Sequence, residues 1–281
     1  MQNLTRQWKK WLAGLMIGVA SGTSQGQTYP SGYLDEILYD NIYNTTLPGQ
    51  NLPRQGLVYT YNYISFRPTK YAARIQNWQY RARREAPLTP PLPFEGDIST
   101  FPPLGKTDLR QDFKMVRSYI KALSDAKYDR DFIFNVIAAY AVKFSNAYYK
   151  DDSPENEIDH RPEIYGENDD WETLREVIKE NGDDCDGLAV LIRQFIMDAG
   201  YSKEQTYMMV LYQPKNQSSH TVAMWYDPKN HTDPLLIDST GQITTQPIRL
   251  SHLDRPPFYY RSRAVYNEND IFTMTYARPK N

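Results

Sequence analysis

The sequence is short of cysteine, of positive charge and of long apolar runs. Its 281 residues include one cysteine, Cys185, so no disulfide bond can form within the chain. The 32 Lys and Arg residues are balanced by 34 Asp and Glu residues, a formal net charge of -2, which excludes the basic surface of a general nucleic-acid binder. No apolar run reaches the roughly 20 residues that span a bilayer. Hydrophobic residues still make up 40% of the chain, enough to build a core.

The N-terminus has the pattern of a secretion signal. Basic residues precede an apolar stretch from Trp11 to Ala20, and small and polar residues follow from Ser21 to Gln27. The apolar stretch is ten residues long, too short for a transmembrane anchor. We therefore predict that residues 1–27 are a cleaved signal peptide and that the mature protein is periplasmic or secreted, without a stable membrane anchor.

The single cysteine lies where a helix is predicted to begin. Exported proteins usually pair their cysteines, so a lone one is an intermolecular link, a small buried hydrophobe or a reactive thiol. Asp183 or Asp184 can cap the helix start, and Gly200 can end it. A thiol in the first turn faces the positive end of the helix, which lowers its pKa. The apolar residues that predict this helix are Leu188, Leu191, Ile192, Phe195, Ile196 and Ala199.

The region before residue 106 differs in composition from the rest. It holds nine tyrosines between Tyr29 and Tyr80 and six prolines between Pro87 and Pro103. A basic helix is predicted from Thr69 to Glu85, and its basic face is expected to be solvated or to pair with acidic residues downstream, with anion binding as the alternative. We interpret residues 28–105 as an N-terminal extension and residues 106–281 as the functional domain.

The rest of the chain has helical patterns first and strand patterns after them. Helices are predicted at 107–124, 129–148 and 171–180, before the helix that begins at Cys185. Alternating patterns at 205–213, 220–227, 234–239 and 271–277 predict antiparallel strands. This order is typical of an α+β fold, with helices packed on an antiparallel sheet. An acidic stretch from Asp151 to Asp186 has fifteen acidic and three basic residues, so it either forms a solvated face or binds a cation.

Two polar residues on successive predicted strands suit nucleophilic catalysis. His220 begins one strand, and Asp238 ends the next, so the two side chains can meet across the sheet. Such a carboxylate fixes the histidine tautomer and favours the imidazolium that activates a thiol. A structural strand histidine is the alternative. His160 and His231 lie in predicted loops, and His252, near a proline pair, is the reserve candidate.

Three segments resemble the bacterial transglutaminase-like cysteine proteinases, within the transglutaminase and papain-like superfamily. The resemblance covers about residues 130–245, including Tyr165-Gly166, Trp171 and Ala189. It implies a papain-like or transglutaminase-like core with the nucleophile at a helix N-terminus. Residue by residue, it implies Cys185 as nucleophile, His220 as general base and Asp238 as orienting carboxylate. The segments are DDWETLREVIKENGDDCDGLAVLIRQFIMDAG, SSHTVAMWYD and PLLIDSTG.

The resemblance also implies an activity. The chain is expected to be an exported cysteine peptidase that hydrolyses amide bonds of a protein substrate through a thioester, with no cofactor required for the chemistry. One alternative is a transglutaminase-type acyltransferase, which shares the thioester. The other is a non-catalytic binding or scaffold protein that keeps the fold.

The sequence departs from the family pattern beside the nucleophile. Family members commonly read Gly-Asp-Cys-Glu-Asp, whereas this chain has one residue more between Gly182 and Cys185, and Gly187 stands where an acid is usual. In this family, acids flanking the cysteine can belong to a calcium site. Asp184 and Asp186 are therefore the expected calcium ligands, with solvated acids or helix caps as the alternative.

Overall fold

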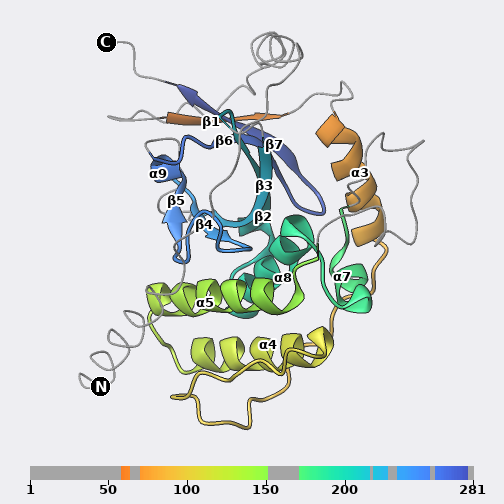
Figure 1. Cartoon of the computed structure of the whole chain (residues 1–281), viewed down its shortest axis with the longest axis vertical. Helices are drawn as coiled ribbons and strands as arrows, with labels where there is room; N and C mark the ends of the chain where they lie inside the picture. Colours follow the sequence, from red (N-terminus) through yellow and green to blue (C-terminus); the bar gives the residue numbers. More distant parts are fainter. Residues whose placement is uncertain are drawn as a thin grey trace. The chain divides into compact units, whose positions relative to one another are not determined.

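The computed structural model describes residues 58–63, 70–150, 171–215, 218–226, 233–253 and 257–277 (Figure 1). The predicted signal peptide, residues 28–57, the acidic stretch before Trp171, and both His160 and His231 lie outside these ranges. Of the helices within them, none combines the length and the apolar character that a bilayer crossing demands.

A seven-stranded sheet forms the centre of the described fold, and each strand pairs antiparallel with its neighbours. The predicted strands are present as β2, β3, β4 and β7, whereas β1, β5 and β6 were not predicted. In spatial order the strands are β1 (Val58–Tyr63), β7 (Ile271–Ala277), β6 (Arg261–Tyr266), β2 (Thr206–Gln213), β3 (Ser218–Trp225), β4 (Leu235–Asp238) and β5 (Ile248–Arg249).

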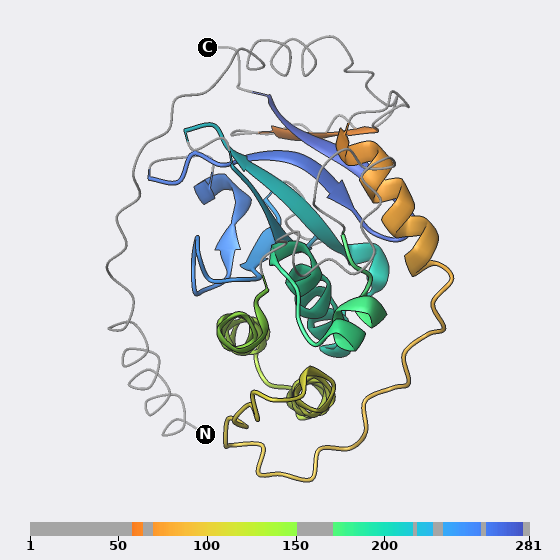
Figure 2. The same cartoon turned by 45° about the vertical axis from the view of Figure 1, so that its right-hand side comes forward.

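The helices mostly precede the strands in sequence, and the α+β class predicted from the sequence is confirmed. α8 and α5 both pack on the sheet, α8 on β2 and β3 and α5 on β4, and α4 packs against these two helices (Figures 1 and 2). The elements are α3 (Lys70–Ala82), α4 (Leu109–Asp125), α5 (Arg130–Tyr148), α7 (Leu174–Glu180), α8 (Cys185–Asp198), the 3-10 turn η1 (Lys203–Gln205) and α9 (Leu250–Leu253).

The two faces of the sheet contact different parts of the chain, because successive strand residues point to opposite sides. On β3, Ala223 and Trp225 join the buried cluster formed with α4, α5 and α8. Val222 and Met224 instead join a separate cluster with Leu250 of α9. The sheet is therefore buried on both sides.

A tight turn between α7 and α8 sets the position of the predicted nucleophile. Asn181 ends α7 with a left-handed φ of 59°, and Gly182 follows with φ 136°. A Cβ atom at Gly182 would lie 2.2 Å from the Tyr148 carbonyl oxygen, so only glycine fits. Asp183 then exchanges backbone hydrogen bonds with Tyr148 and Lys150, which fixes the approach of the chain to Cys185.

The proline-rich segment after α3 packs on the helices although it has no regular structure (Figure 2). Phe101 stacks on Tyr140 with ring centroids 4.3 Å apart, and the Tyr140 hydroxyl donates to the Pro102 carbonyl at 2.9 Å. Arg117 donates to the Thr89 carbonyl at 3.1 Å. This segment therefore covers part of the α4 and α5 core.

Candidate active site

Cys185 is the first residue of α8, as predicted, and the helix start is tied to the sheet. The Asp184 side chain caps the helix by accepting from the backbone N–H of Asp186 at 3.0 Å. The buried Ser239 hydroxyl lies 2.9 Å from the carbonyl oxygen of Cys185 and 2.7 Å from that of Thr221. Ser239 thus joins the first turn of α8 to β3.

The thiol of Cys185 has Thr221 as its polar neighbour. The backbone N–H and the hydroxyl of Thr221 both donate to the sulfur, which favours the thiolate. Burial, together with the charges of Asp184 and Asp183, acts in the opposite direction and more strongly, so the pKa of the thiol is well above its ordinary value. The expected effect of the helix N-terminus is therefore outweighed, and the resting thiol is protonated.

His220 and Asp238 form a buried pair across β3 and β4. Nε2 of His220 lies 2.8 Å from Oδ1 of Asp238, and the two residues are 7% and 3% exposed. Burial alone would raise the pKa of Asp238, but the hydrogen bond and charge of His220 and the backbone N–H groups of Thr240 and Ile243 hold this pKa below its ordinary value. The carboxylate is therefore ionised and fixed in place.

The structure does not join the cysteine to the histidine. His220 shares a sheet face with Val222, whereas Thr221, the partner of Cys185, points to the α8 face. Within the described ranges, no hydrogen bond links Cys185 and His220. The reserve candidate His252 is exposed on α9. The structure thus places His220 beside Asp238, and it places Cys185 beside Thr221, the residue that follows His220.

Three carboxylates gather beside the nucleophile. Glu172, Asp183 and Asp186 each place one carboxylate oxygen within 4.8 Å of the others. The Oδ2 atoms of Asp183 and Asp186 are buried and have no hydrogen-bond partner in the described part of the chain. Burial, followed by the neighbouring carboxylates, raises the pKa of both aspartates well above the ordinary value.

This acidic cluster overlaps the predicted calcium ligands without being identical to them. Asp186 belongs to it, and Asp184 groups instead with Cys185 and Asp186. Buried carboxylate oxygens without hydrogen-bond partners are the ligands that calcium prefers, so the donor set fits a hard divalent cation. Glu172 and Asp183 were not predicted as ligands, although both lie in the acidic stretch.

Gly187 explains how Asp183 reaches the cluster. A Cβ atom at position 187 would lie 1.7 Å from Oδ2 of Asp183 and 2.6 Å from Cγ2 of Val177, far inside contact distance. The Asp183 carboxylate occupies the space that a side chain at 187 would need.

Helix α3 holds Glu172 in this position. Nε1 of Trp78 donates to the Glu172 carbonyl at 3.0 Å. The Arg81 guanidinium donates to the Trp171 carbonyl and pairs with the Glu176 carboxylate, both at 2.6 Å. The predicted basic helix thus does pair with the acidic stretch through Arg81, and it helps to build the site.

The described part of the chain is an α+β domain in which a cysteine begins a helix packed on an antiparallel sheet that carries a His–Asp pair. No protein-family model and no curated protein matches the chain. Among solved structures, it is similar to calcium-bound LapG of Legionella pneumophila, with 16% identity and a TM-score of 0.36 over 56% of this chain and 87% of that chain. LapG and its EGTA-treated form both match over 71% of this chain, with 15% identity and a TM-score of 0.41, covering 87% and 84% of those chains.

Proposed function

We propose that the chain is an exported cysteine peptidase of the transglutaminase-like type, which hydrolyses amide bonds of a protein substrate. The observation that carries the proposal is the buried His220–Asp238 pair, because His220 is adjacent in β3 to the residue that holds the thiol of Cys185. These residues would supply a nucleophile, a base and a group that orients the base.

In the proposed reaction, Cys185 passes its proton to His220, and its sulfur attacks the carbonyl carbon of the substrate. Backbone N–H groups at the start of α8 stabilise the oxyanion. His220 then gives the proton to the leaving amine, and a thioester remains. Water attacks the thioester, His220 accepts the proton of the water, and Cys185 is released. Asp238 accepts from Nε2–H of His220, which leaves Nδ1 as the basic nitrogen.

The proposed reaction requires the thiol to leave its Thr221 partners, and the His220 ring, which lies on the other face of β3, to move until Nδ1 reaches the sulfur. Catalytic hydrogen bonds often form only when substrate is bound, so a resting state without this contact is compatible with the proposal. The raised pKa of the Cys185 thiol fits such a resting state, since an exposed thiolate in an oxidising compartment would be prone to oxidation.

We also propose that Glu172, Asp183 and Asp186 hold a calcium ion, with Asp184 close to them. Its positive charge would offset the repulsion among these carboxylates. The fit rests on the two buried oxygens without hydrogen-bond partners and on the raised pKa of both aspartates.

Calcium should raise the melting temperature of the wild-type chain at neutral pH by about 5 °C or more when it saturates the site. Because the pKa values of Asp183 and Asp186 are raised in the folded state, their contribution to stability is present at low pH and is lost as the pH rises through the folded pKa. In chelator, the chain should therefore melt lower at neutral pH than at mildly acidic pH. Thermal unfolding at both pH values measures this.

The Asp183→Asn variant should melt higher than wild type in chelator at neutral pH, and it should lose the calcium-dependent increase. The control is Glu95→Gln, which removes an exposed carboxylate and should keep the full increase. An unchanged calcium response in Asp183→Asn would show that the cluster is not the binding site.

A non-catalytic binding protein is the second candidate function. It is favoured by the environment of the thiol, which has Thr221 as its partner and a raised pKa. Such a protein would bind its partner without cleaving it, and its cysteine would stay unreactive in every state.

Alkylation by iodoacetamide measures the state of the thiol. At neutral pH, the native chain should react at least about tenfold more slowly than the urea-unfolded chain, whose thiol has a pKa of about 8.5. The reason is burial and the charge of Asp184, which disfavour the thiolate. Faster reaction in the native chain would contradict the protonated resting thiol. A rise in the native rate when a candidate substrate is added would favour the peptidase over the binding protein.

A further inference from the structure

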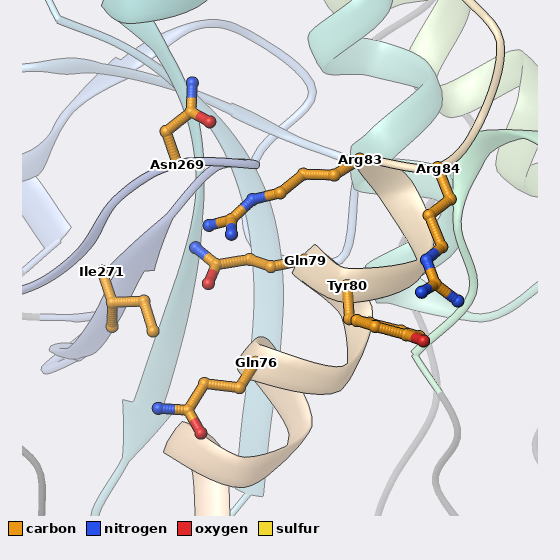
Figure 3. A pocket seen from close by; sticks show the side chains of 7 residues that line it. All are labelled: Gln76, Gln79, Tyr80, Arg83, Arg84, Asn269 and Ile271. Atoms are coloured by element: carbon orange, nitrogen blue, oxygen red, sulfur yellow. The ribbon is translucent and has the colours of Figure 1, made fainter.

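The outward face of α3 lines an open pocket that is separate from the acidic cluster (Figure 3). The same helix uses its other face, through Trp78, to hold Glu172. The pocket has a volume of about 510 Å³ and lies between α3 and the turn that joins β6 to β7. Its lining residues are Gln76, Gln79, Tyr80, Arg83, Arg84, Asn269 and Ile271.

Hydrogen bonds fix the two walls of the pocket to each other. Nε2 of Gln79 donates to the carbonyl oxygens of Asn267 and Asp270 at 2.7 and 3.1 Å. Nε of Arg83 donates to the carbonyl oxygen of Glu268. The pocket is therefore formed before any ligand binds, which reduces the entropy cost of binding.

Two arginines in the pocket have no acidic partner in the described ranges. The Arg84 guanidinium lies 3.8 Å from the centroid of the Tyr80 ring, and this contact orients it. Of the acids near them, Glu176 pairs with Arg81 and Glu268 pairs with Arg193. Arg83 and Arg84 thus present oriented guanidinium groups to solvent, and guanidinium groups match carboxylates in geometry.

We propose that this pocket binds an extended acidic segment of a protein. The lining residues of α3 and of the turn that follows it run from Gln76 to Arg84, about 12 Å at the helical rise, which equals the length of about four extended residues. Arg83 and Arg84 would pair with acidic side chains, and the Gln76 amide would pair with the peptide backbone. A compact anion such as phosphate would fill only a small part of this volume.

Fluorescence anisotropy of a labelled octapeptide that alternates Glu and Ser tests the proposal. The Cys185→Ala full chain serves as the binding protein, so that binding is measured without turnover and is independent of the proposed peptidase activity. We expect saturable binding of this peptide and none of the matching Lys and Ser peptide. Equal binding of both peptides, or binding of neither, would overturn the proposal.

Charge variants locate the site. On the Cys185→Ala background, Arg83→Gln with Arg84→Gln should weaken binding about tenfold, since each exposed pair contributes up to a fewfold in affinity. Arg84→Gln alone, which removes no side-chain hydrogen bond to any residue that the structure describes, should account for part of this loss. The control replaces the exposed Arg110 and Lys114 of α4 by Gln and should bind like its parent. Equal weakening by the control pair would show attraction to net charge alone and would refute the pocket.

Discussion

Replacing Cys185 by alanine should abolish hydrolysis of a protein substrate, with a loss of about a thousandfold or more. The reason is that the thioester cannot form without the sulfur, whereas the rest of the site is unchanged. Because the substitution removes one sulfur atom at a half-buried position, the free energy of unfolding should change by only about 1 kcal/mol. Cleavage of a labelled protein, followed together with the circular dichroism melting curve, measures both effects.

The two histidines that the structure describes provide a matched control. His220→Ala should lose activity to a similar degree, because the base and the partner of Asp238 are both removed. His252→Ala alters an exposed residue of α9 and should keep wild-type activity. Cleavage by Cys185→Ala at the wild-type rate would disprove the assignment of the nucleophile, and full activity in His220→Ala would disprove that of the base.

Gly187→Ala should produce a large loss of stability, about 3 kcal/mol in the free energy of unfolding. The added Cβ atom would lie 1.7 Å from Oδ2 of Asp183 and 2.6 Å from Cγ2 of Val177, so both side chains must move. This loss exceeds the gain of about 1 kcal/mol that alanine brings to a helix interior. Urea unfolding measures the difference.

A double variant shows whether the loss of stability in Gly187→Ala comes from the steric clash with Asp183. In an Asp183→Ala background the main obstacle is gone, so Gly187→Ala should cost about 2 kcal/mol less than it does in the wild type. Gly105→Ala serves as a control, because its Cβ would lie 3.3 Å from the nearest atom, Oδ1 of Asp112, and should change stability by less than about 1 kcal/mol. Strictly additive effects of the two substitutions at 183 and 187 would show that these residues do not compete for space.

The sequence predicted the regular elements of this fold well, because their patterns are local. The helix that begins at Cys185 and the strands that carry His220 and Asp238 follow from apolar periodicity. The His220 and Asp238 side chains, which were expected to meet across the sheet, lie 2.8 Å apart. Their catalytic roles stay predictions. Strand β6 was missed, since much of its stability comes from pairing with β2, which lies about fifty residues earlier in the chain.

Tertiary packing decides those features of the site that could not be predicted from the sequence. A helix N-terminus lowers the pKa of a thiol, but burial against β3 raises that of Cys185 more, and burial cannot be read from neighbouring residues. Glu172 joins the acidic cluster through Trp78, which is 94 residues away in the sequence. Asp183 could be recognised as a member of the acidic cluster only together with Gly187, because its carboxylate occupies the space that a side chain at position 187 would fill.

The hold of α3 on Glu172 limits how far the chain can be shortened. Starting the protein at residue 106, where its composition changes, would delete Trp78 and Arg81 and expose the Trp171 and Tyr266 rings that Trp78 helps to cover. We expect such a truncated protein to aggregate or to lose its acidic cluster even if its helices and strands still form. Genetic dissection of this protein should therefore keep both α3 and β1, which pairs with β7 in the sheet, and should place any cut before residue 58.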